Sequence, residues 1–366
     1  MKRSQSLFSI LACTLLIFSL TGCQNDSSAS ISTVSESDIS SALFNWYLVE
    51  AYDEACTIHD GKDELFTSQI EGKDTETWIR EQAVTLYKKH FAIENEFESR
   101  GLSLSDEDSQ TIDNTVEQYW DAAGYSSYYE SKGVDEEAFR AATANDIKRD
   151  MLFEDMKEEL TASLTDQALS DYFDSHYAMI KYIAFPYNAY NQSTTGVADS
   201  DTIDYDTLFK EYQNRIQGDS DFNTAIDEIQ ADDKLLSGGV NTSKIISNVE
   251  EGTSSETVPI PSDPYATIVS LGQSGFPEAF LEGLFDQEYG TPLVYDDTSN
   301  LYQIIYERLD ISGETEVFES LQDEIRTKMG EELFEEKIAE LAEPISTEDI
   351  DDVINQDIET KFTSAS

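Results

Sequence analysis

The apolar positions between Ser35 and His176 recur with helical spacing. Between Trp78 and Phe97 they step by threes and fours once His90 is counted in the same row; the members are Ile79, Ala83, Leu86, Ile93 and Phe97. Such a row gives a helix one apolar face that packs against a core. The first part of the chain is therefore predicted to be helical, with His90 at a core edge rather than in a catalytic site.

Polar pairs mark where two of these helices should begin. Ser35 with Asp38, and Ser105 with Asp108, have the three-residue spacing of a capping box. In that motif each side chain accepts a hydrogen bond from the backbone N–H of the other residue. A longer helix is expected from Asp135 to Leu160, after the glycine at position 133.

Strand character appears only later in the chain. The segments Met179–Pro186 and Leu301–Leu309 are rich in β-branched and aromatic residues. Helical spacing occupies three stretches between them, at 205–217, 222–230 and 277–286, and Gly, Ser and Pro are frequent from 237 to 275. Strands and helices together predict an α+β block over residues 178–310.

A long amphipathic helix is predicted after the second strand. Its apolar positions recur every four residues and then continue; they are Val317, Leu321, Ile325, Met329, Leu333, Ile338 and Leu341. A lone helix of this kind is marginal in water, so it needs a partner, and the early helices offer matching faces. We therefore expect residues 36–177 and 311–345 to form one helical domain with the α+β block inserted. Residues 346–366 are acidic and are expected to fray.

The first residues have the pattern of an export signal. Lys2 and Arg3 precede an apolar run from Leu7 to Leu20, which is shorter than the roughly 20 residues of a membrane-spanning helix. The ending Leu20-Thr21-Gly22-Cys23 resembles the lipobox of bacterial lipoproteins. The resemblance implies removal of residues 1–22, lipid on Cys23, and residues 23–35 as a flexible tether on the outer face of the membrane. An ordinary cleaved signal with an incidental cysteine is the alternative.

The charge balance excludes some partners. The chain has 23 Lys plus Arg against 75 Asp plus Glu, a net charge of −52. Such a surface repels nucleic acid and anionic lipid head groups, so neither is an expected partner. The acid excess is expected mainly to keep the protein soluble. No calcium-binding loop of the pattern Asp-x-Asp/Asn-x-Asp/Asn-Gly occurs in the sequence.

The cysteines predict neither a disulfide nor a metal site. Cys13 would leave with the signal and Cys23 would carry lipid, so Cys56 would be the remaining thiol. Cys56 and His59 are three apart and could face one metal ion on a helix, but no further ligand cluster accompanies them. We predict that both are ordinary helix residues, with no metal and no cofactor.

Several short motifs, taken in order, resemble one family. They are Gly101-Leu102-Ser103, the run from Gly133 to Phe139, Leu164-Thr165-Asp166, Gly238-Gly239, and Gly290 with Pro292. In this order they resemble the lipid-anchored foldases related to parvulin, with the arrangement of SurA and PrsA proteins. The resemblance covers most of the chain after Cys23. It implies a helical chaperone domain built from both chain ends and an inserted parvulin-like domain.

The resemblance also implies where an isomerase site would lie. Active parvulins are described with a His on the first strand, a His on the last strand, and a Cys or Asp near the glycine turn. Tyr182 and Gln303 stand where the two histidines would be, and Asp232 or its neighbour Asp233 holds the acidic position. Phe276 and Phe280 fall at the spacing of the apolar wall that would receive a proline ring. Their alternative role is as plain core aromatics.

These observations predict a membrane-anchored, extracytoplasmic foldase or chaperone that binds unfolded or secreted protein clients. With both histidines absent, prolyl isomerase activity is expected to be weak or lost. One alternative is an active isomerase whose network is rebuilt from Gln303, Tyr182 and an Asp. Another is the substrate-binding lipoprotein of an ABC importer, which would need alternating strands and helices from the start of the mature chain.

Overall fold

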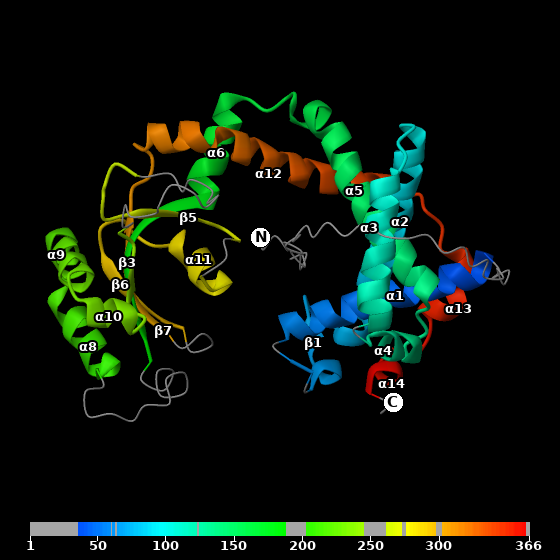
Figure 1. Cartoon of the computed structure of the whole chain (residues 1–366), viewed down its shortest axis with the longest axis horizontal. Coiled ribbons are helices and arrows are strands. Elements are labelled where there is room, and N and C mark those ends of the chain that lie inside the picture. The colour runs from blue at the N-terminus through cyan, green and yellow to red at the C-terminus, as the bar shows by residue number, and fades with distance from the viewer. Residues whose placement is uncertain are drawn as a thin grey trace, which may run out of the picture.

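The computed structural model describes residues 36–59, 61–62, 64–122, 124–187, 203–244, 261–272, 276–297 and 302–363. They form a helical region and a sheet region, which are connected by the long helix α12, Thr315–Ala342 (Figure 1). The fold is α+β, as predicted from the sequence.

The helical region is built around three long helices that share one core. Its elements are α1 (Glu36–Ile58), η1 (Leu65–Thr67), β1 (Gln69–Ile70), β2 (Lys73–Asp74), α2 (Thr75–Ser99), α3 (Asp106–Val116), η2 (Glu117–Ala122), α4 (Ser126–Ser131), α5 (Glu136–Thr161) and α6 (Asp166–His176). Phe44 and Leu48 of α1, Ile79 of α2 and Ala138 of α5 lie in that core. The predicted face of α2 is confirmed, because Ile79, Ala83, Ile93 and Phe97 are all buried. 

Two of the expected local features can be compared with the structure directly. The Ser105 capping box is confirmed: the Asp108 N–H donates to Ser105 Oγ at 3.1 Å, and the Ser105 N–H donates to Asp108 Oδ2 at 2.8 Å. His90 is buried, and its Nδ1 lies 2.9 Å from the hydroxyl of Tyr47. The other predicted capping residue, Ser35, lies outside the described residues.

Helix α12 packs against two different partners along its length. Phe334, Ile338 and Ala342 in its second half share a cluster with α2 and α5, as predicted. The first half agrees with the expectation in part. Leu321 and Ile325 pack against α6, which belongs to residues 36–177, and also against Met179 and Ile268 of the sheet, which was not expected. The reason is length: 28 residues give a helix of about 42 Å, and its first turns reach the sheet region (Figure 1).

The acidic C-terminal segment, residues 346–366, was expected to fray, and this expectation is wrong for its described part. It forms η3 (Glu348–Ile350), α13 (Asp351–Ile354) and α14 (Ile358–Thr363). Ile350 and Ile358 are buried in the core of the helical region. Isolated isoleucines among acids thus gain an apolar partner surface that the segment alone does not have.

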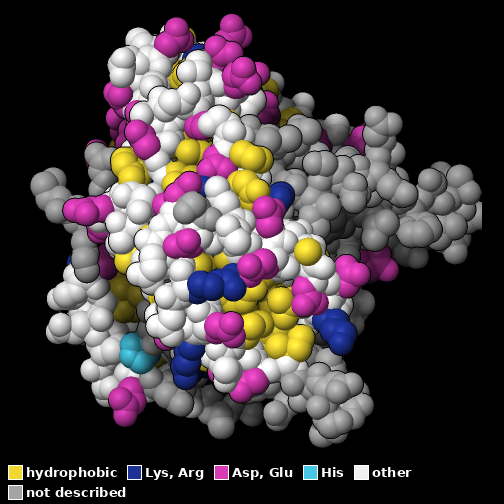
Figure 2. Space-filling model, turned by 90° about the vertical axis from the view of Figure 1, so that its left-hand side faces the viewer, with side chains coloured by type: hydrophobic (Ala, Val, Ile, Leu, Met, Phe, Trp, Pro, Cys, Tyr) yellow, Lys and Arg dark blue, Asp and Glu magenta, His cyan; other side chains and the backbone are white. Residues whose placement is uncertain are grey.

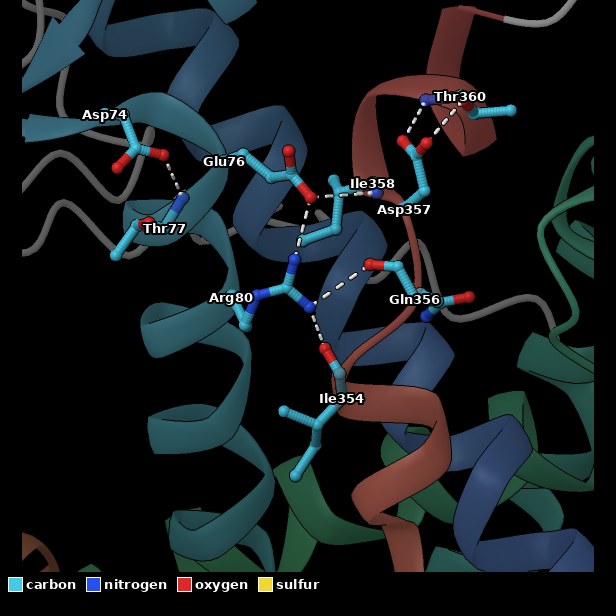
Figure 3. Close-up of polar contacts among 9 residues, drawn as sticks. All are labelled: Asp74, Glu76, Thr77, Arg80, Ile354, Gln356, Asp357, Ile358 and Thr360. Atoms are coloured by element: carbon cyan, nitrogen blue, oxygen red, sulfur yellow. Dashed lines mark hydrogen bonds and ion pairs between the residues drawn. The ribbon is translucent and has the colours of Figure 1, made fainter.

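Polar contacts hold the C-terminal segment to α2 (Figure 3). The Arg80 guanidinium donates to the backbone carbonyls of Ile354 and Gln356 and also pairs with Glu76 at 2.7 Å. Glu76 in turn accepts a hydrogen bond of 3.3 Å from the Ile358 backbone N–H. Side chains of α2 therefore satisfy three backbone groups between the end of α13 and the first residue of α14.

The sheet region contains five antiparallel strands in the order β4-β3-β7-β6, with β5 also paired to β3. The strands are β3 (Tyr177–Pro186), β4 (Asn241–Thr242), β5 (Thr267–Ser270), β6 (Pro292–Asp297) and β7 (Tyr302–Leu309). The two strands predicted from the sequence are confirmed as β3 and β7. They form the centre of the sheet, where Tyr182 lies opposite Tyr306 and Phe185 opposite Gln303.

Helices cover both faces of this sheet. On one face α8 (Tyr205–Arg215), α9 (Asp219–Gln230) and α10 (Asp233–Ser237) pack on Ile183, Phe185 and Ile305. On the other face α11 (Glu278–Leu284) packs on Ile180 and Ile304. Because side chains alternate along a strand, the register decides which face each candidate residue occupies.

In the part of the chain that the structure describes, no helix is long and apolar enough to cross a membrane. The predicted signal, the tether and Cys23 all lie outside this part.

Candidate functional site

Four aromatic side chains form a row across the α11 face of the sheet. The Tyr182 ring of β3 meets the Phe276 ring edge-on at 5.3 Å between centroids. Phe276 stacks on Phe280 of α11 at 5.3 Å, and Phe280 contacts Tyr295 of β6 at 5.1 Å. Tyr182, Phe276, Phe280 and Tyr295 are called the aromatic row below. It runs from the β4–β5 side of the sheet to the opposite edge.

One ring of the row is buried, and the other three are partly exposed to solvent. Phe280 is buried together with Leu281 and Leu284, the residues of α11 that face the sheet. Tyr182, Phe276 and Tyr295 are only half-buried. Burial raises the pKa of the Tyr182 phenol, which is therefore neutral at physiological pH. The exposed part of the row is thus uncharged and aromatic, suited to contact with apolar side chains.

An open cavity of about 560 Å³ lies at one end of the row. Its lining residues come from β3, the end of α9, α10, the turn into β4, and β5; they are Tyr182, Gln230, Leu236, Gly239, Val240, Asn241, Thr242, Ser243, Lys244 and Thr267. Ser243 holds the cavity wall to β3, because its backbone N–H donates to the Tyr182 carbonyl at 3.0 Å. Tyr182 belongs to both the cavity lining and the aromatic row.

The predicted glycine turn connects α10 to β4 beside this cavity. A Cβ on Gly238 would lie 1.8 Å from the hydroxyl oxygen of Tyr205, so no other residue fits there without displacing that ring. Gly239 has a φ of +94°, in the left-handed region that favours glycine. This pair is explained by the path of the backbone rather than by chemistry.

Gln303 lies on the opposite face from the aromatic row. It is buried on β7, and its Nε2 donates to Asp206 Oδ1 of α8 at 3.1 Å. Its register partner on β3 is Phe185, whose side chain points into the α8–α10 core. The structure therefore does not bring Gln303 together with Tyr182.

Asp232 is also separate from the row. It is exposed at the start of α10, where its carboxylate accepts hydrogen bonds from the backbone N–H groups of Lys234 at 2.9 Å and Leu235 at 3.3 Å. This is the geometry of a helix N-cap. Of the predicted site residues, Tyr182, Phe276 and Phe280 lie together, whereas Gln303 and Asp232 do not join them.

A charged cluster in the sheet region was missed by sequence reasoning. Lys181 is buried on β3 and pairs with Asp219 of α9 and, at 2.7 Å, with Asp263. Glu307 lies beside it on β7, and its pKa is raised by burial and by Asp219, although Lys181 lowers it. The cluster ties α9 and the approach to β5 onto the sheet. A lysine inside an otherwise apolar strand was the signal for it.

Cys56 and His59, which were considered as metal ligands, lie at the end of α1 and directly after it. Burial raises the pKa of the Cys56 thiol, with Tyr52 as its hydrogen-bond partner. Among the described residues, no group of three or more His, Cys, Asp or Glu side chains is arranged to hold a metal ion.

Neither a protein-family model nor a curated protein matches the chain. Among solved structures it is similar to the foldase protein PrsA from Streptococcus pneumoniae, at 12% identity and a TM-score of 0.34, over 79% of this chain and 98% of that one. It is also similar to PrsA from Lactococcus lactis, at 11% identity and a TM-score of 0.30, over 73% and 78% of the two chains. A third similar structure is PrsA from Bacillus subtilis, at 12% identity and a TM-score of 0.27, over 81% of this chain and 100% of that one. Likenesses at this level carry no argument about function, which rests on the residues of this chain.

Proposed function

We propose that this protein is an extracytoplasmic chaperone of the foldase type, held to the outer face of the cell membrane by lipid on Cys23. It binds unfolded segments of exported proteins and has little or no prolyl isomerase activity. The observation that carries this proposal is the aromatic row, with three partly exposed rings (Tyr182, Phe276 and Tyr295) and an open cavity beside Tyr182.

Such a surface suits unfolded clients because they expose apolar side chains that a folded protein buries. Each square ångström of apolar surface removed from water contributes about 25 cal/mol. Aromatic rings supply large contact area with little loss of conformational freedom.

The charge distribution favours clients over other partners. Figure 2 shows acidic side chains spread over the face of the molecule that carries α8 to α10, with apolar patches between them. The net charge of −52 disfavours nucleic acid and anionic lipid surfaces. An acidic surface keeps a protein soluble even though some apolar side chains stay exposed.

We expect weak isomerase activity because Gln303 and Asp232 do not lie beside the aromatic row. Rotation about a prolyl bond has a barrier of about 18–20 kcal/mol, and a catalyst must present polar groups matched to the twisted amide. Gln303 is engaged with Asp206 on the other face, and Asp232 caps α10. The rebuilt network of Gln303, Tyr182 and an Asp therefore has no support in the geometry.

The importer alternative is also disfavoured. The sheet of the described residues is antiparallel at every pairing, and it follows a long helical region in the chain. A binding protein of that class needs parallel strands alternating with helices.

The test is suppression of aggregation by the purified mature protein, followed by light scattering of a chemically denatured secreted protein on dilution. We expect suppression at stoichiometric ratios, weakened in Tyr182→Ala and Phe276→Ala. Tyr125→Ala is the matched control, because Tyr125 is a 51% exposed aromatic in the helical region. Suppression absent at every ratio would refute the proposal.

The anchor is tested separately from the binding surface. Cells expressing the protein are fed a radiolabelled fatty acid, and the chain is examined for label and for retention in the membrane fraction. We expect label on the native chain and release of Cys23→Ser into the medium or periplasm. An unlabelled native chain would remove the anchor from the proposal without affecting client binding.

A further inference from the structure

Strand β6 forms an edge of the sheet. It is the last member of the order β4-β3-β7-β6, and in the described part of the chain its pairing partner is β7 alone. In an antiparallel pair, backbone N–H and C=O groups point alternately toward and away from the partner. The outward groups of an edge strand are therefore available to pair with another extended chain.

The middle of β6 carries none of the features that usually block such an edge. Natural edges are protected by lysines, prolines, bulges or inward-pointing charges. Here Pro292 begins the strand and Asp296 and Asp297 end it, so Leu293-Val294-Tyr295 lies open between them. Val294 is 38% exposed, and Tyr295 continues into the aromatic row through Phe280.

The exposed charged side chains along α11, the loop after it and β6 are all acidic. From residue 245 to residue 307 the sequence contains no Lys and no Arg. The exposed acidic residues of α11, of the loop that follows it and of β6 itself are Glu278, Glu282, Asp286, Glu288 and Asp296. A second copy of this edge would bring like charges together, which destabilises cross-strand pairing. The complementary partner is a basic one.

We propose that β6 binds extended client segments in which apolar residues alternate with Lys or Arg, and that the segment adds to the sheet as an antiparallel strand. This inference rests on the proposed function and names its client class. Register places Leu293 and Tyr295 on the face of the aromatic row and Val294 and Asp296 on the other face. Apolar client residues lie over the row, and basic residues lie beside Asp296 with their stems against Val294.

Main-chain pairing and charge contribute separately, so each can be removed in turn. Backbone hydrogen bonds provide affinity for any extended segment, and alternate side chains provide selectivity. The probes are a nine-residue peptide alternating Val and Lys, its Val and Glu counterpart, and a Val and Lys peptide with N-methylated alternate amides. The measurement is hydrogen–deuterium exchange in the full mature protein.

We expect the Val and Lys peptide at saturation to slow exchange in residues 292–297 by about tenfold, since outward amides become bonded. The Val and Glu and N-methylated peptides should give no such protection. Val294→Lys should weaken the Val and Lys peptide about fivefold, because it places a charge on the open edge without touching the core. Ile58→Lys is the matched control, as Ile58 is 54% exposed at the end of α1.

Binding of the Val and Lys peptide without protection of residues 292–297 would overturn the inference, and so would equal protection by the Val and Glu peptide. Suppression of client aggregation that depends on Tyr182 and Phe276 but not on Val294 would overturn the inference and leave the proposed function standing. Absence of any binding by clients or peptides would refute both.

Discussion

Tyr182 and Gln303 lie on neighbouring strands of one sheet but on opposite faces of it. Tyr182 faces α11 and contacts Phe276, whereas Gln303 faces α8 and donates to Asp206 at 3.1 Å. The two positions that would carry an isomerase network are thus divided by the backbone of the sheet. Tyr182 and Gln303 therefore cannot act together in one site.

The first prediction concerns prolyl isomerisation. In a protease-coupled assay with proline peptides, the purified mature protein should leave the rate at its uncatalysed value. Gln303→His should not restore activity, since the new imidazole would point into the α8–α10 core. Turnover approaching that of an active parvulin would contradict the arrangement, whether in the native protein or in the variant.

The second prediction concerns the C-terminal segment. Ile358 is completely buried against α1 and α2, so Ile358→Ala should lower the free energy of unfolding by about 2–5 kcal/mol. Glu359→Ala, a change at the exposed neighbouring position, should have an effect within about 0.5 kcal/mol. Urea unfolding followed by circular dichroism measures both. Equal stability of the two variants would mean that the segment does not contribute to the core.

The third prediction follows from the partly buried amine of Lys361. Burial, together with the nearby charge of Lys132, lowers the pKa of Lys361 from 10.5 to about 8. The unfolded chain then binds more protons than the folded chain between these two values, so stability rises with pH in that window. The stability of the native protein relative to Lys361→Met should increase from pH 8 to about pH 10.5. A difference that stays flat would place Lys361 in water.

The fourth prediction concerns the junction between α12 and α5. A Cβ on Gly330 would lie 2.9 Å from the Thr161 Cγ2 atom and 3.6 Å from the Phe153 ring. Gly330→Val should therefore destabilise the protein by about 1–3 kcal/mol, because two packed helices must move apart. Gly283→Val on α11 is the control, since nothing lies within 4 Å of its added Cβ. Thermal unfolding of both variants would reveal whether the α12 contact is as close as described.

Local patterns in the sequence were sufficient for much of the fold. The buried face of α2, the capping box at Ser105 and the two central strands all depend on residues near one another in the chain. The C-terminal segment was wrongly expected to fray. Its few apolar residues become buried only by packing against α1 and α2, which lie far away in the sequence. The contact of Leu321 and Ile325 with the sheet was not predicted, because α12 has two partner regions and sequence periodicity identifies neither.

The candidate site divides in the same way. Phe276 and Phe280, which the family resemblance singled out, lie in one row with Tyr182, and their role in binding stays a prediction. Gln303 could not be assigned to a face in advance, because a register change of one residue exchanges the two faces of a strand. The two partners of Lys181 come from separate segments of the chain, so spacing along the sequence gave no indication of them.

Photo-crosslinking from position 276 tests client binding at the aromatic row most directly. A photoreactive phenylalanine analogue replaces Phe276, or Tyr125 as the control, and the mature protein is irradiated with one purified, denatured secreted protein. We predict a covalent adduct from position 276 that excess unlabelled denatured protein competes away, and little adduct from position 125. Equal yields from both positions, or none from position 276, would contradict binding at the row.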